Sequence, residues 1–152
     1  MAYTQPTTAE FKAFFDRDFE FATEQATETS VGDLSRVRDR DIERAYSEAN
    51  ANFNVALFVS QAQYAQAFLY LSAHYLCHDM ASAQEGLSSK FTWLAAQRSV
   101  GDVFEGYFVP DVVKKSPWAM FITSTKYGAK YYSIIRPLMA GNIISIQGMT
   151  QI

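Results

Sequence analysis

Two histidines, a cysteine and an aspartate lie close together near the middle of the sequence and are its strongest candidates for chemistry. His74 and His78 are four residues apart, so a helix would place both imidazoles on one face, at the spacing of many metal sites. The sequence holds 2 histidines, and no His-Glu-x-x-His motif supplies the general base of a metalloprotease. A closed metal site would need further ligands. We therefore expect His74 to be hydrogen-bonded near the core and His78 to lie on the surface at a helix end.

The other reactive groups form no recognisable catalytic set. Cys77 has no histidine and asparagine partners at a known spacing, and a lone buried cysteine usually behaves as a small hydrophobe. The glycines do not form a G-x-x-x-x-G-K phosphate loop. The sequence thus predicts a protein that is not an enzyme, with no catalytic, metal-binding or cofactor-binding residues. A small helical metal-binding protein that uses His74 and His78 is the alternative from another functional class.

Composition favours a single soluble domain over residues 1–152. Hydrophobic residues make up 49% of the chain and charged residues 19%, which is typical of a globular protein. The net charge is −3 without a run of Lys or Arg, whereas proteins that grip duplex DNA usually carry a basic stripe. The N-terminus has no apolar signal-peptide region, and the apolar stretch at 65–76 is interrupted and too short to span a bilayer. One cysteine excludes an internal disulfide framework.

The elements that must position these residues are mainly helical. Residues 1–8 are expected to form a flexible tail, although Thr7 and Glu10 match a capping box for a short helix with an apolar stripe of Phe11, Phe14 and Phe15. Residues 23–38 are polar and predict a loop. A second helix is expected from Asp39, as its cap, and the longest helix over 60–84 at the centre of the core.

The second half combines extended and helical patterns. Residues 91–109 mix β-forming residues with glycines and predict an extended arm, either irregular or a β-hairpin. Ser116-Pro117 is a typical helix start, and Thr125 is expected to cap a final helix that Pro137 and Gly141 end. The predicted fold class is therefore mainly α (α+β), a small helical bundle with an extended arm or β-hairpin and an extended C-terminal tail.

The tail at 142–152 alternates apolar and polar residues and carries no charge. Such a β-prone segment suits a strand added to a neighbouring subunit's sheet. Pairing with residues 91–109 of the same chain is the open alternative, because short strands are usually paired locally.

Several local patterns follow one another along the chain. An aromatic cluster of Phe11, Phe15 and Phe19 precedes the helix that begins at Asp39, and Ala73-His74 lies in the long helix. The two most specific patterns come later. They are Ser-Val-Gly-Asp-Val at 99–103 and Thr-x-Tyr-Gly at 125–128, the second followed by Tyr131 and Ile135.

In this order the patterns resemble a family of tailed-phage head-completion proteins, the head–tail connector adaptors, over most of the chain. The resemblance implies a small helical bundle whose copies form a dodecameric ring beneath the portal protein. It also implies a tail-side connector or tail terminator protein as a second partner, and DNA as cargo that passes through the channel. The expected location is the neck of the virion, and the host cytoplasm during assembly. A neighbouring stopper or tail terminator of the same connector is the alternative within this class.

Within that resemblance, Thr125, Tyr127 and Gly128 are a structural motif, in which Thr125 caps a helix and Gly128 permits close backbone approach. Gly101 and Asp102 are expected to form a turn in the arm. The candidate contacts to neighbouring subunits or the portal lie in the arm and the tail: Arg98, Ser99, Gly101, Asp102, Phe104, Tyr107, Phe108, Ile144, Ile146 and Ile152.

Overall fold

The computed structural model describes residues 3–22, 36–85, 97–100, 103–106 and 116–140, and it is mainly helical, as the sequence predicts. The elements in chain order are α1 (Thr8–Phe14), α2 (Asp39–Asn52), a single 3₁₀ turn η1 (Val55–Leu57), α3 (Gln61–Glu85), strands β1 (Gln97–Val100) and β2 (Val103–Gly106), α5 (Pro117–Ile122) and α6 (Lys126–Ala140).

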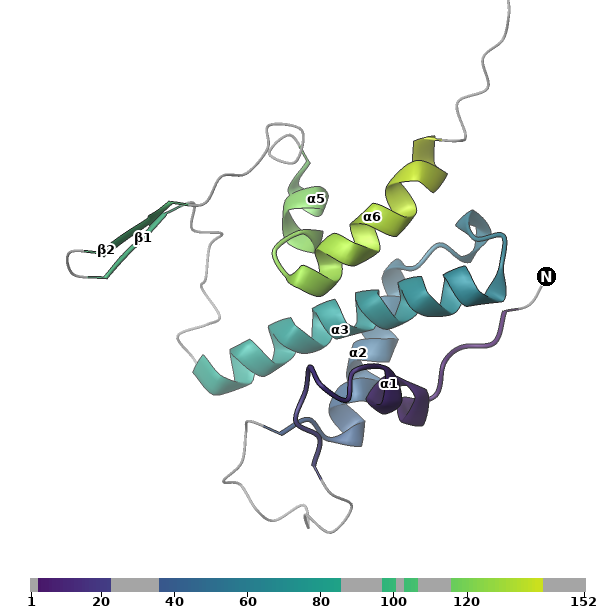
Figure 1. The fold of residues 1–152 in the computed structure, drawn as a ribbon, viewed down its shortest axis with the longest axis horizontal. Coiled ribbons are helices and arrows are strands. Elements are labelled where there is room, and N and C mark those ends of the chain that lie inside the picture. The colour runs from purple at the N-terminus through teal and green to yellow at the C-terminus, as the bar shows by residue number, and fades with distance from the viewer. Residues whose placement is uncertain (1–2, 23–35, 86–96, 101–102, 107–115, 141–152) are drawn as a thin grey trace, which may run out of the picture.

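Helix α3 is the centre of the bundle. It crosses the whole body, with α6 along one side and with α1 and α2 on the other (Figure 1). Phe68, Leu71 and Leu76 of α3 are fully buried, and the small side chains of Ala67 and Ala73 are buried beside them. Small residues let neighbouring helices approach closely. The long central helix expected over 60–84 is therefore confirmed, and it ends one residue later.

An aromatic cluster joins the start of the chain to α6. Phe15 meets Tyr127 edge to face with ring centroids 5.4 Å apart, and Phe19 stacks on Tyr127 at 5.3 Å. Phe11, also fully buried, contacts both phenylalanines. Each such pair stabilises the fold by about 0.5–1.5 kcal/mol beyond the area it buries. Phe14 departs from the expected buried stripe, since it is 43% exposed at the bundle surface beside Tyr70.

Two expected helix starts are confirmed by their hydrogen bonds. The backbone amide of Glu10 donates to the Thr7 hydroxyl at 3.2 Å, and the Glu10 carboxylate accepts from the Thr7 amide at 2.7 Å. The Ser116 hydroxyl accepts from the Ala119 amide at 3.3 Å, with Pro117 in the first turn. These caps form because serine and threonine hydroxyls accept from the free amides of a first turn.

Helix α2 begins at the expected residue but has a different cap. Arg38 occupies the cap position, and its backbone amide donates to the Asp41 carboxylate at 3.0 Å. Asp39, expected as the cap, lies one residue inside the helix and instead pairs with Lys12 of α1 at 2.5 Å. The Asp39 carboxylate thus links α2 to α1 by an ion pair and does not cap its own helix.

The expectation of a flexible tail at 1–8 is wrong for residues 3–8. The Tyr3 hydroxyl donates to the Phe58 carbonyl at 2.7 Å, and its ring stacks on Tyr64 at 5.1 Å. The Thr4 amide and carbonyl both bond to the Gln61 side chain, at 3.0 and 2.6 Å. An aromatic ring and paired backbone groups thus fix this segment against the start of α3, which local sequence patterns do not reveal.

Of the two residues expected to end α6, the helix continues past Pro137 but ends at Ala140, directly before Gly141. Pro137 lies inside α6, which runs on to Ala140. A proline removes one hydrogen bond to the carbonyl four residues earlier. The missing bond falls in the last turn, where the helix has few further bonds to lose.

The expected arm contains a two-stranded antiparallel hairpin, so of the two forms foreseen for it, the hairpin is the one observed. Ser99 pairs with Phe104, and Arg98 with Glu105. The hairpin lies apart from the helices, and the main contacts of each strand are with the other strand (Figure 1). Gly101 and Asp102, the expected turn, are outside the described residues.

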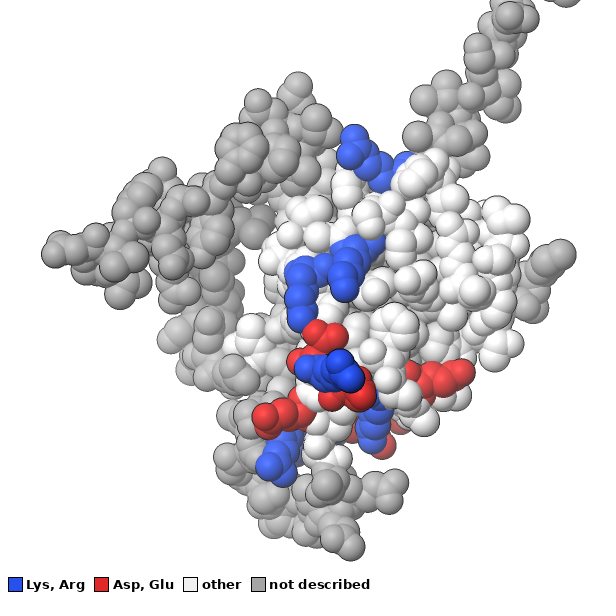
Figure 2. All heavy atoms as spheres, viewed as in Figure 1, with Lys and Arg blue, Asp and Glu red and all other residues white. Residues whose placement is uncertain are grey.

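The described charges divide between two parts of the face shown in Figure 2. Basic side chains lie over the α6 side, whereas acidic and basic ones alternate over the side of α1 and α2. Lys126 of α6 bridges the two parts through a 2.6 Å ion pair with Asp18. Of the helices in the described ranges, none combines the length and apolar character needed to cross a membrane.

Candidate functional site

The strongest candidate for chemistry, the histidine pair, lies where α3 meets the α5–α6 junction. His74 is fully buried, and its Nδ1 lies 2.7 Å from the Thr125 hydroxyl. The same hydroxyl accepts the Gly128 amide at 3.0 Å, so it caps α6 as expected. The expected structural roles of His74 and Thr125 are therefore confirmed, and one hydroxyl serves both.

The hydrogen-bond pattern assigns a proton position for His78 and leaves two for His74. Thr125 Oγ1 accepts from the Gly128 amide, and either its second lone pair or its own proton can pair with Nδ1 of His74, so this bond forms with either neutral tautomer of that ring. Ser124 donates to the Phe121 carbonyl at 2.7 Å, so it accepts from Nε2 of His78 at 3.0 Å. His78 therefore carries a hydrogen on Nε2.

Burial keeps His74 neutral over a wide pH range. Desolvation, with a smaller contribution from the neighbouring His78, lowers the pKa of His74 to about 4; the two ring centroids are 4.8 Å apart. Burial also lowers the pKa of His78, which was expected at the surface and is half-buried there, stacked on the Phe121 ring. Nε2 of His74 is buried without a hydrogen-bond partner among the described residues.

Gly128 is where α6 touches the end of α5 most closely. A Cβ atom there would lie 1.8 Å from the Ile122 carbonyl oxygen and 2.6 Å from Nδ1 of His74. Only glycine allows this approach, which confirms the expected role of Gly128. Tyr127, the third residue of the motif, is buried between Phe15 and Phe19.

The arrangement around the histidines is that of a structural joint. Each ring bonds to a hydroxyl of the α5–α6 junction, and within the described ranges no three His, Cys, Asp or Glu side chains are grouped to hold a metal ion. Sequence reasoning identified His74, His78 and Thr125 but missed Ser124 and Phe121. Serine and phenylalanine are common in helix ends, so no pattern in the sequence signalled their part.

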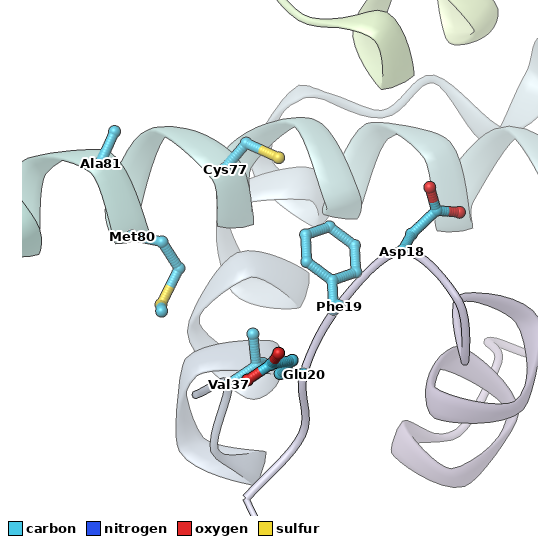
Figure 3. A pocket seen from close by; sticks show the side chains of 7 residues that line it. All are labelled: Asp18, Phe19, Glu20, Val37, Cys77, Met80 and Ala81. Carbon is cyan, nitrogen blue, oxygen red and sulfur yellow. The ribbon is translucent and has the colours of Figure 1, made fainter. Parts of the chain in front are cut away.

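Cys77 lines a separate hollow of about 550 Å³ between α3 and the segments around Phe19 and Val37 (Figure 3). Met80 and Ala81 of α3 complete its apolar part, and the carboxylates of Asp18 and Glu20 add polar groups. Burial raises the pKa of the Cys77 thiol to about 11, so the reactive thiolate is scarce at neutral pH. The sulfur therefore serves as an apolar wall atom, in agreement with the sequence-based expectation.

The candidate contact residues fall mainly outside the described part of the chain. The backbones of Arg98, Ser99 and Phe104 belong to the hairpin. The other candidates, namely Gly101, Asp102, Tyr107, Phe108, Ile144, Ile146 and Ile152, lie outside the described residues, and the structure does not test them. The two proposals for the strand at 142–152 also stay predictions.

Comparison with protein families, with curated proteins and with solved structures found no match for this chain.

Proposed function

We propose that this chain is a structural virion protein of a tailed phage, an adaptor that forms a ring beneath the portal and joins the head to the tail. It acts without a catalytic group, by fitting its surfaces against identical copies, the portal protein and a tail-side connector or terminator. The resemblance in sequence suggests this role. The structural observation that best supports this proposal is the hairpin of β1 and β2, which lies apart from the helices.

The hairpin of β1 and β2 needs a partner to be a stable element. Its strands form four residue pairs with each other, and the helices pack without it. A two-stranded hairpin on its own is marginally stable in water, and packing against a further element makes it stable. A neighbouring subunit in a ring, or the portal, would supply that element.

The contacts among the resembling motifs also support the proposal. Phe15 and Phe19, near the start of the chain, pack on Tyr127, and His74 forms a hydrogen bond with Thr125. Motifs of the resemblance that lie far apart in the sequence are thus in contact where α3 and the start of the chain pack against α6. This packing makes the bundle a rigid body from which the hairpin can extend.

The mechanism is mechanical. Subunits dock on the portal after DNA packaging, the hairpin and residues 142–152 contact neighbours or the portal, and the ring extends the channel for DNA. A net charge of −3 suits a channel wall, because like charge disfavours tight contacts with phosphates.

Co-sedimentation with phage heads tests the proposal directly. Purified chain is mixed with DNA-filled heads that carry a portal, and with heads that lack one. We expect saturable binding to the first and none to the second, with a ring beneath the portal in electron micrographs. Equal binding to both, or no binding, would refute the adaptor role. A ring found only at the far end of the neck would place the chain at the stopper or terminator instead.

Two variants identify the contacting segments. Deletion of residues 142–152, or replacement of residues 98–105 by a short Gly-Ser linker, should leave a folded monomer that fails to form rings on portals. Ser47→Ala, on the exposed face of α2, is the control and should assemble normally. Unchanged assembly of both altered chains would show that other surfaces make the contacts.

A further inference from the structure

An apolar surface extends across the outer side of α5 and α6. Trp118 of α5 is 41% exposed and Met139 of α6 is 52% exposed. Both line a hollow of about 360 Å³ that Leu57 of η1 and Ile135 of α6 also line, and both line a second hollow of about 340 Å³ on the side of Tyr132. Exposed apolar patches of this kind mark binding surfaces in water-soluble proteins.

The lining of the two hollows favours an apolar occupant that brings no positive charge. Apart from apolar and aromatic side chains, the first is lined by Asn52 and Asn54, and the second by Ser116 and Arg136. No carboxylate lines either hollow in the described part of the chain. An occupant with two apolar side chains on one face, neutral amides between them and no charge would fit.

Residues 142–152 have these properties and start at the edge of the surface. They carry no charge, and Ser145 separates Ile144 from Ile146, so in an extended chain the two isoleucines fall on one face about 7 Å apart. The distance from Met139 back to Tyr132 along the axis of α6 is roughly 10 Å, whereas eleven extended residues can span about 36 Å. The segment can therefore reach both hollows.

The short tether favours the segment's own subunit over a neighbour. Linkers of a few residues give effective concentrations in the millimolar range, which free subunits in solution do not approach. Gly141 follows the last residue of α6, and glycine at this position lets the chain turn back along the helix. The short connection to α6 and the glycine at its end both favour residues 142–152 of the same subunit as the occupant.

We propose that residues 142–152 fold back over the α5–α6 surface of the same free subunit, with Ile144 and Ile146 seated beside Trp118. The inference does not depend on the connector role. In a connector subunit, it would keep an apolar, β-prone segment covered until assembly.

Fluorescence of Trp118 tests the inference in a Trp93→Phe background, where Trp118 is the remaining tryptophan. In the full chain, we expect Trp118 to be shielded from acrylamide. The double variant Ile144→Asp/Ile146→Asp should raise the quenching constant several-fold, whereas Ser145→Asp, on the opposite face of the extended segment, should leave it unchanged. Far-UV circular dichroism confirms that each variant is folded.

Dilution distinguishes the proposed occupant from a neighbour's segment. Shielding that persists on dilution, in a species that sediments as a monomer, supports docking on the same subunit. Shielding lost on dilution, or confined to a dimer, means that a neighbour's segment is bound and overturns the inference. Equal quenching in the parent and the Ile144→Asp/Ile146→Asp variant also overturns it. None of these results bears on portal binding, which is measured separately with heads.

Discussion

Replacing Thr125 by valine should destabilise the protein through two hydrogen bonds at once. Valine keeps the shape of threonine but lacks the hydroxyl. The change therefore removes the acceptor of the Gly128 amide, at 3.0 Å, and the hydrogen-bond partner of Nδ1 of His74, at 2.7 Å. The buried side chains of α6, namely Tyr127, Tyr131 and Ile135, are unchanged. The loss of stability therefore measures the hydrogen bonds between α3 and the start of α6.

The expected loss is the sum of a cap and a buried unsatisfied group. Loss of a helix N-cap costs about 1 kcal/mol, and leaving a buried polar atom without its partner costs about 1–3 kcal/mol. This second cost applies in full to the buried His74 ring, because its other nitrogen, Nε2, already has no hydrogen-bond partner among the described residues. We expect Thr125→Val to lower the free energy of unfolding by about 2–4 kcal/mol. The melting temperature should fall by roughly 5–15 °C for a domain of this size.

Urea unfolding followed by far-UV circular dichroism measures this difference. Thr125→Ser is the matched control, since serine keeps the hydroxyl and loses one methyl group, which should cost about 1 kcal/mol or less. If Thr125→Val unfolds within about 0.5 kcal/mol of the parent, a typical spread for surface changes, the shared hydroxyl does not stabilise the joint and the reasoning is refuted.

Three further experiments probe the surroundings of His74 and the hollow beside Cys77. Gly128→Ala should lower the free energy of unfolding by about 2 kcal/mol, because a Cβ would lie 1.8 Å from the Ile122 carbonyl oxygen. This crowding outweighs the gain in helix propensity. The control, Ala129→Gly at the exposed neighbouring site, should cost about 1 kcal/mol through helix propensity alone. The free energy of unfolding should fall as the pH drops from about 6.5 to about 4, because the unfolded chain protonates His74 first while burial holds its folded pKa at about 4. Urea unfolding at pH 7 and pH 4.5 measures this loss, at most about 3 kcal/mol, and His74→Gln should reduce the slope. Cys77, with its pKa raised to about 11, should react with Ellman's reagent at pH 8 far more slowly than free cysteine until urea unfolds the chain; equal rates would contradict its burial.

Local sequence determined where several helices begin and which faces they bury. The capping box of Thr7 and Glu10, Ser116 before Pro117, and Thr125 at the start of α6 were all readable, because a cap joins residues within one turn. The buried stripe of α2, with Ile42, Ala45 and Ala49, was equally readable from its period. Such features depend on interactions across three or four residues, which the sequence displays directly.

The tertiary structure alone decided how distant segments meet. The Tyr3 hydroxyl reaches the Phe58 carbonyl 55 residues away, and His74 reaches Thr125 across 51 residues. Nothing in the sequence near Tyr3 or His74 specifies these partners, because they depend on how α3 packs against the chain start and α6. The apolar surface around Trp118 has the same origin, since it forms where α5, α6 and η1 meet. Local interactions thus set the elements, while packing set the joint and the surface on which the proposals rest.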